Sequence, residues 1–361
     1  MPFRLSRSFV LGAAVAVWFG AASVAPVSAQ RKPAKAPAAS ASAPALVWPL
    51  PPEQPRIKFV RSYQGVDDFK TKKKSRFTSL MLGPQDADGQ SSDHLVKPYG
   101  VATTSTGKLW VTDTASRRLF AFDPTAQAVT FFEGDGAGRL VKPIGVAVDE
   151  QDNLFVADGT LKRVFGYTPQ GRMFLAIGKD GEFQTPSGLA IDRARHLLYV
   201  TDSSLHVVKC YSDVDGHEVR TIGSRGDGPG QFNFPTNVAL DRQGRIYVAD
   251  TFNFRVQIFE ADGTFVKAFG TPGDSPGTFN RAKGIGVDSE GHIYVLDAGF
   301  NNFQIFDDTG QLLLFVGAPG RRPGEFFLPA GLYVDGEDRI YVADQANARI
   351  QVFQYLKAAT K

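Results

Sequence analysis

Apolar and polar residues alternate in short runs between residues 56 and 356, and the runs recur in a fixed order. Alternation with a period of two is typical of strands that bury one face. The most regular run reads Tyr-Val-Ala-Asp or a close variant, and it recurs at intervals of about 45 residues. Its six copies end at Asp113, Asp158, Asp202, Asp250, Asp297 and Asp344.

Each copy belongs to a unit of four predicted strands. An apolar segment such as Gly145–Ala147 precedes the copy, and two further runs follow it, as Val256–Phe259 and Phe265–Gly270 do in the fourth unit. Four short strands in about 45 residues are typical of one blade of a β-propeller. The six units predict an all-β fold, a six-bladed β-propeller with four antiparallel strands per blade. A sandwich or barrel is the alternative, and the regular spacing argues against it.

The two ends of the repeat region predict how the ring closes. The sixth unit begins at Phe327 and ends near Leu356, after its third strand. Residues 56–65, which precede the first unit, match the pattern of a fourth strand. We expect this N-terminal strand to complete the last blade, because closure protects sheet edges from pairing with other chains.

The segment before the propeller (56–356) has two predicted parts. Residues 1–29 resemble a signal peptide, with Arg4 and Arg7 ahead of an apolar run and a small-residue cleavage site at Val27–Ala29. The alternative is a retained membrane anchor, but the apolar run is short for a bilayer span. Residues 30–55 are rich in Ala and Pro and predict a flexible tether. A periplasmic or secreted location is expected, with no transmembrane segment in the mature chain.

Two further segments lie outside the repeats. Residues 66–94 form an insertion with a basic run at Lys72–Lys74, which predicts a solvated loop or, alternatively, a partner-docking element. Residues 357–361 are a C-terminal tail.

Composition limits the class of partner. The formal net charge of the 361-residue chain is +3, too small for the electrostatic footprint of a nucleic-acid-binding protein, so no nucleic-acid partner is expected. The single cysteine, Cys210, excludes an intramolecular disulfide. It lies in a predicted strand where other repeats carry Ala, Gly, Ile or Val, which indicates a small buried apolar residue. A monomer is expected.

The best-defined repeats carry a family resemblance. Asn233–Gly270 and Phe327–Phe353 resemble NHL repeats, and the resemblance extends over residues 56–356. It implies the propeller fold and, with the predicted signal peptide, an exported bacterial member. The family includes RNA-binding, protein-binding and lyase propellers, so the resemblance alone does not assign an activity.

Aspartate and arginine recur five residues apart in four blades. The pairs are Asp113/Arg118, Asp158/Arg163, Asp250/Arg255 and Asp344/Arg349. They predict structural ion pairs that tie the turn between the second and third strands, since a guanidinium offers five donors in a fixed fork. The alternative is a ligand-binding role, and repetition argues against it because a catalytic residue is usually needed once.

Catalytic and metal-binding residues are not predicted. The lyases that the family resembles use histidine ligands for zinc, but the five histidines here share no short metal-ligand spacing. They are expected to be surface or turn residues. No cofactor is expected, and the sequence leaves open the alternative that a calcium or zinc ion lies in the channel.

The remaining evidence favours a binding or scaffold protein that engages an envelope or extracellular protein, peptide or glycan. Candidate binding residues near the channel mouth and the blade connections are Asn237, Arg281, Lys283, Arg321 and Arg322. A metal-dependent lyase or lactonase is one alternative, and a purely structural module of an envelope assembly is another.

Overall fold

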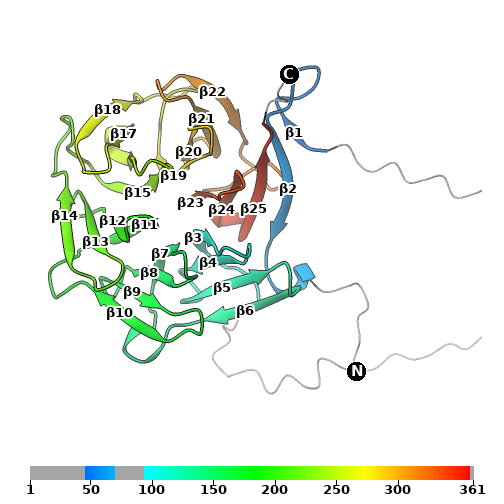
Figure 1. Cartoon of the computed structure of the whole chain (residues 1–361). Coiled ribbons are helices and arrows are strands. Elements are labelled where there is room, and N and C mark those ends of the chain that lie inside the picture. The colour runs from blue at the N-terminus through cyan, green and yellow to red at the C-terminus, as the bar shows by residue number, and fades with distance from the viewer. Residues whose placement is uncertain (1–44, 70–92, 358–361) are drawn as a thin grey trace, which may run out of the picture. The chain divides into compact units, whose positions relative to one another are not determined.

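The computed structural model describes residues 45–69 and 93–357. The predicted signal peptide, most of the predicted tether and the basic run at 72–74 lie outside these residues. The described residues form six antiparallel sheets arranged around a central channel, which confirms the predicted six-bladed propeller (Figure 1). None of the helices in this part of the chain is long and apolar enough to cross a bilayer.

The inner half of each blade consists of its first and second strands. The first strands line the channel and are β3 (Pro98–Thr103), β7 (Pro143–Val148), β11 (Pro186–Asp192), β15 (Pro235–Leu240), β19 (Ala282–Val287) and β23 (Gly331–Val334). The second strands carry the Tyr-Val-Ala-Asp run and are β4 (Leu109–Asp113), β8 (Leu154–Asp158), β12 (Leu197–Asp202), β16 (Ile246–Asp250), β20 (Ile293–Asp297) and β24 (Arg339–Asp344).

The outer half consists of the third and fourth strands. The third strands are β5 (Arg118–Asp123), β9 (Arg163–Tyr167), β13 (Val207–Ser212), β17 (Arg255–Phe259), β21 (Asn302–Phe306) and β25 (Arg349–Tyr355). The fourth strands are β6 (Ala128–Phe132), β10 (Met173–Ile177), β14 (Glu218–Ile222), β18 (Phe265–Phe269), β22 (Leu312–Val316) and, for the last blade, β2 (Ile57–Tyr63).

The ring closes between the two ends of the propeller, as predicted. Strand β2 pairs antiparallel with β25, from Ile57 opposite Tyr355 to Tyr63 opposite Ile350. The short helical turn Val66–Phe69 follows β2, and the backbone of Gly65 bridges to His94 at the start of blade 1.

The predicted end of the tether at residue 55 is wrong. Strand β1 (Val47–Trp48) pairs with β2 and gives the last blade a fifth strand. The Trp48 ring packs edge-on against Phe353 with their centroids 5.7 Å apart. The apolar Val47–Trp48 pair therefore belongs to the propeller.

The core is divided among the joints between blades. Each pair of neighbouring blades encloses its own apolar cluster, such as the one in which Ile258 of blade 4 and Ile285 of blade 5 are buried together. Because both faces of a blade are covered by its neighbours, the Tyr-Val-Ala-Asp strands of blades 2, 4 and 5 are buried along their whole length. The blades therefore support one another around the ring.

Candidate functional site

The strand order gives the propeller two different faces. The first strand of each blade begins at the face that carries the loops between blades and the turns between second and third strands. We call this the connection face. The turns between first and second strands, and those between third and fourth strands, form the opposite face.

Six buried aspartates organise the connection face. Each ends a second strand, is fully buried, and accepts hydrogen bonds from backbone N–H groups that lead into the first strand of its own blade. In blade 1 the Oδ2 atom of Asp113 accepts from the N–H groups of Val96 (2.7 Å) and Lys97 (2.9 Å). In blade 5 Asp297 does the same for Asn280 and Arg281. The carboxylates thus hold the chain as it enters each channel strand.

Two of the predicted ion pairs are formed, and each belongs to a larger network of hydrogen bonds. The Nε atom of Arg255 lies 2.9 Å from Oδ2 of Asp250, and that of Arg349 lies 2.7 Å from Oδ2 of Asp344. Each arginine also donates to three backbone carbonyls of the loop that enters its blade. For Arg349 these carbonyls belong to Arg321, Arg322 and Glu325. The pairs therefore clamp the connecting loops of blades 4 and 6.

The other two arginines lie differently. Arg163 approaches the exposed carboxylate of Asp180 in the loop that leaves blade 2 for blade 3, at 3.6 Å, rather than Asp158. The guanidinium of Arg118 lies over the ring of Phe131, 4.5 Å from its centroid. Asp113 and Asp158 keep their backbone partners in both blades.

The channel is narrow where the first strands approach one another most closely. Five of the six equivalent positions there are glycines, and a Cβ atom at Gly145 or Gly331 would collide with a backbone carbonyl oxygen of the next blade. The glycines therefore permit the blades to pack. The sixth position holds Asn237, whose Oδ1 accepts from the N–H of Val238.

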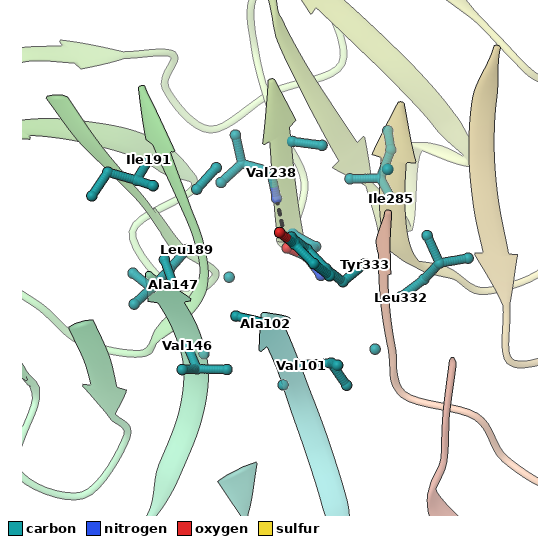
Figure 2. A pocket seen from close by; sticks show the side chains of 18 of the residues that line it. Val101, Ala102, Val146, Ala147, Leu189, Ile191, Val238, Ile285, Leu332 and Tyr333 are labelled. Carbon is teal, nitrogen blue, oxygen red and sulfur yellow. Dashed lines mark hydrogen bonds between the residues drawn. The ribbon is translucent and has the colours of Figure 1, made fainter. Parts of the chain in front are cut away.

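Along the direction of the first strands, a cavity of ≈ 200 Å³ comes after this ring of glycines. Its wall is mainly apolar, with Val101, Val146, Leu189 and Ile285 among the lining residues (Figure 2). Figure 2 shows Tyr333 of blade 6 at the centre of the view, where the other first strands carry Ala or Gly. The channel is therefore partly filled by one aromatic side chain.

The structure separates the five predicted binding residues into three groups. Asn237 lines the channel cavity. Arg281 is exposed immediately before β19, and Lys283 is half-buried within that strand. Arg321 and Arg322 are exposed on the loop that Arg349 clamps.

Exposed apolar side chains accompany these cations, although the sequence analysis did not single them out. On the connection face Phe252 is 52% exposed, and its ring lies 5.0 Å from that of Phe234. Phe327 and Leu328 of blade 6 are each 47% exposed, and Val96 of blade 1 is exposed as well. Their positions directly before a first strand, or directly after the repeated aspartate, are the only signal that could have identified them.

The turns of the opposite face are polar, and their carboxylates have partners within the fold. Asp241, Asp288 and Asp335 each accept from backbone N–H groups of their turns and from a buried tyrosine hydroxyl. The hydrogen bond from His292 to Asp288 raises the pKa of that imidazole. These aspartates therefore stabilise the turns.

The histidines lie apart from one another. His94, His196 and His217 are exposed beside carboxylates, whereas His206 is buried and its Nδ1 accepts from the N–H of Phe234. His206 is buried, but it lies in a turn, as expected for a surface or turn residue. Within residues 45–69 and 93–357 no three His, Cys, Asp or Glu side chains are grouped to hold a metal ion.

Cys210 is fully buried in β13, as predicted. Burial raises the pKa of its thiol to about 11. Because the thiolate is the reactive form, we expect Cys210 to resist a thiol reagent such as 5,5′-dithiobis(2-nitrobenzoate) at pH 8 in the folded protein and to react fully in denaturant. Rapid labelling of the native protein would show that this strand opens readily.

Comparisons with known proteins agree with this geometry. The NHL repeat model matches residues 232–259, and a six-bladed β-propeller family model matches residues 289–357. NHL repeat-containing protein 3 of Homo sapiens is 50% identical over 38 residues, and that of Mus musculus is 37% identical over 82 residues. These matches cover 10% and 22% of this chain and only 11% and 23% of the relatives.

Solved structures share the fold over most of their length. Virginiamycin B lyase from Staphylococcus aureus is 13% identical with a TM-score of 0.53, covering 72% of this chain and 96% of the lyase. A gluconolactonase from Xanthomonas campestris is 18% identical with a TM-score of 0.55, covering 73% of this chain and 87% of that protein. At these identities the likeness concerns the fold alone. With its ring of six four-stranded units, the chain is a six-bladed β-propeller that contains an NHL repeat at residues 232–259.

Proposed function

We propose that this chain is an exported, non-catalytic binding propeller that engages a protein, peptide or glycan through the connection face and the channel mouth. The observation that carries the proposal is the contrast between the two faces. Among the described residues, five exposed apolar side chains lie among the turns and loops of the connection face. The turns of the opposite face carry two, Leu50 and Val214, and present mainly engaged carboxylates. Exposed apolar surface rimmed by polar residues is typical of an interaction site.

The size of the channel supports a surface partner over an enclosed small molecule. Its cavity of ≈ 200 Å³ is smaller than the roughly 300–1,000 Å³ of most small-molecule sites. The ring of glycines separates this cavity from a partner that lies on the connection face. The main contact area would then lie on the face around the mouth.

The clamped loops are suited to binding. The backbone around Arg321 and Arg322 is fixed by Arg349 and by Glu325, whose Oε2 accepts from both N–H groups at 3.0 Å. The two arginine side chains extend from this fixed backbone and are exposed. A rigid loop loses little conformational entropy on binding, so more of the contact energy appears as affinity.

The proposal predicts crosslinks from one face. A photo-reactive phenylalanine analogue at position 252 or 327 should form covalent adducts with a partner in the producing cell, and one at position 337, on the opposite face, should form few. Combining the analogue with Arg321→Ala and Arg322→Ala should lower adduct yield about fivefold, as expected for ~1 kcal/mol of rim contact. Adduct yield is read by gel shift and mass spectrometry.

Two results would overturn the proposal. Adducts from position 337 alone would place the partner on the opposite face. Stoichiometric zinc or calcium in protein purified without chelator or affinity tag, measured by mass spectrometry, would reject the non-catalytic assignment and favour the lyase or lactonase alternative. The double alanine variant should fold normally, because its backbone hydrogen bonds do not depend on the two side chains.

A further inference from the structure

Lys283 occupies an unusual place at the channel mouth. It is the second residue of β19, and its carbonyl accepts a hydrogen bond from Thr236 of blade 4 at 3.1 Å. The equivalent positions of the other first strands hold Tyr99, Ile144, Ser187, Thr236 and Ala330. Since an alanine fits this position in blade 6, blade packing does not require a lysine there.

Lys283 is half-buried, and two other cations influence its ammonium group. Burial lowers the pKa of Lys283, and the neighbouring cations Arg281 and Lys97 lower it further. No carboxylate within the described ranges lies within 4.0 Å of this ammonium group. The nearest repeated aspartates, Asp297 and Asp113, are themselves buried against the N–H groups that lead into β19 and β3.

This arrangement costs folding free energy. A partly desolvated cation without a counter-ion loses hydration and gains no ion pair. Lys142 occupies in blade 2 the position that Arg281 occupies in blade 5, directly before the first strand, so the mouth carries a further cation. An anion seated among these groups would recover the missing interaction.

Apolar side chains lie on both sides of the cations. Thr251, which precedes Phe252, donates a hydrogen bond to the carbonyl of Ala282 at 2.7 Å, so the Phe234–Phe252 pair borders the start of β19. On the other side the N–H of Leu328 donates to Asn301 of blade 5 at 2.8 Å. A chain that crosses blades 4 to 6 would therefore meet apolar, cationic and again apolar surface.

We propose that the channel mouth of the connection face binds a carboxylate of an extended polypeptide whose acidic residue is flanked by apolar side chains, with Lys283 as the central contact. This inference rests on the proposed function and names the class of partner. A polypeptide fits better than a nucleic acid, because carboxylates are interspersed with the cations on the outer loops of the same face, so that no continuous basic surface follows a phosphate backbone. The carboxylates are Glu133, Asp135, Asp180, Glu182, Asp227, Asp274 and Glu325.

The test is selection of a random dodecapeptide phage library on the intact protein. We expect enriched peptides to contain Asp or Glu next to Phe, Leu or Ile. Their affinity, measured by fluorescence anisotropy, should fall at least about thirtyfold for Lys283→Met, as expected when one partner of a buried charge pair is removed. Lys283→Arg should retain most of the affinity. The matched control is Lys267→Met, which removes a cation from the outer strand β18 and should bind normally.

Thermal unfolding separates a binding role from a structural one. Because methionine removes a desolvated charge without removing bulk, Lys283→Met should be at least as stable as the wild-type protein. A lower melting temperature would assign Lys283 to the fold and overturn the inference.

Three binding results would also reject the inference. Enriched peptides without acidic residues, or equal binding to Lys283→Met, would exclude the carboxylate while preserving the binding face. Tighter binding of single-stranded oligouridylate than of any selected peptide would replace the polypeptide with a nucleic acid. Absence of any enriched peptide, together with absence of crosslinks from position 252, would instead be a failure of the proposed function itself.

Discussion

Replacing Arg349 by alanine is expected to lower the free energy of unfolding by about 3 kcal/mol, the lower end of the usual cost of breaking a buried ion pair. Arg349 and Asp344 are both buried, and the substitution leaves the carboxylate without its cation. Three loop carbonyls lose the hydrogen bond from Arg349 at the same time, and those of Arg322 and Glu325 keep another donor. The loss stays at the lower end because Asp344 keeps hydrogen bonds from Phe327, Asn347 and Gln351.

Urea unfolding followed by tryptophan fluorescence measures this loss, since Trp48 packs within the last blade. The matched control is Arg163→Ala, whose partner Asp180 is exposed and whose pair should contribute little. Arg255→Ala should behave like Arg349→Ala, because its network in blade 4 is equivalent. Similar losses in the Arg163 and Arg349 variants would reject the structural role of the clamp.

A single methyl group at Gly145 is expected to cost about 3 kcal/mol, the upper end of typical overpacking penalties. The added Cβ atom would collide with the carbonyl oxygen of Ser187 in the next blade. Both backbones belong to four-stranded sheets that are fixed by their neighbours, so neither can move away without a large cost in free energy. The urea concentration at the midpoint of unfolding should fall in proportion to this loss of free energy.

Two alanine substitutions serve as controls for Gly145→Ala. A Cβ at Gly336, in a turn of the opposite face, has no neighbour within 4 Å, so Gly336→Ala should change stability by less than about 0.5 kcal/mol. Asn237→Ala tests the one ring position that already carries a side chain, and it too should have a small effect. A harmless Gly145→Ala would mean that the channel wall yields more easily than its geometry implies.

The repeated aspartate illustrates how far sequence reasoning reaches. Its spacing predicted the blade number, and the apolar runs around it, together with the missing fourth strand of the sixth unit, predicted the strand order and the closure by β2. Its role was only partly predicted. The constant partners of the aspartate are backbone N–H groups, which leave no residue-type signal, and this explains why blades 3 and 5 retain Asp202 and Asp297 without the arginine.

Other features depend on contacts between distant parts of the chain. Trp48 lies in a segment whose composition resembles a tether, and only its packing against Phe353 assigns it to the last blade. Lys283 was recognised as a candidate cation, but its burial beside Arg281 and Lys97 depends on how blades 5 and 1 approach the channel. Periodicity alone carries no information about such approaches.

The closure of the ring has a consequence for the order of synthesis. On the ribosome β2 emerges before blades 1 to 5, whereas β25, its partner, emerges after them. Blades 1 to 5 can assemble from consecutive segments as they appear, but the last blade must wait until all five have emerged. During that wait β2 has an open edge, and its Lys58 and Arg61 would discourage premature pairing with other nascent chains.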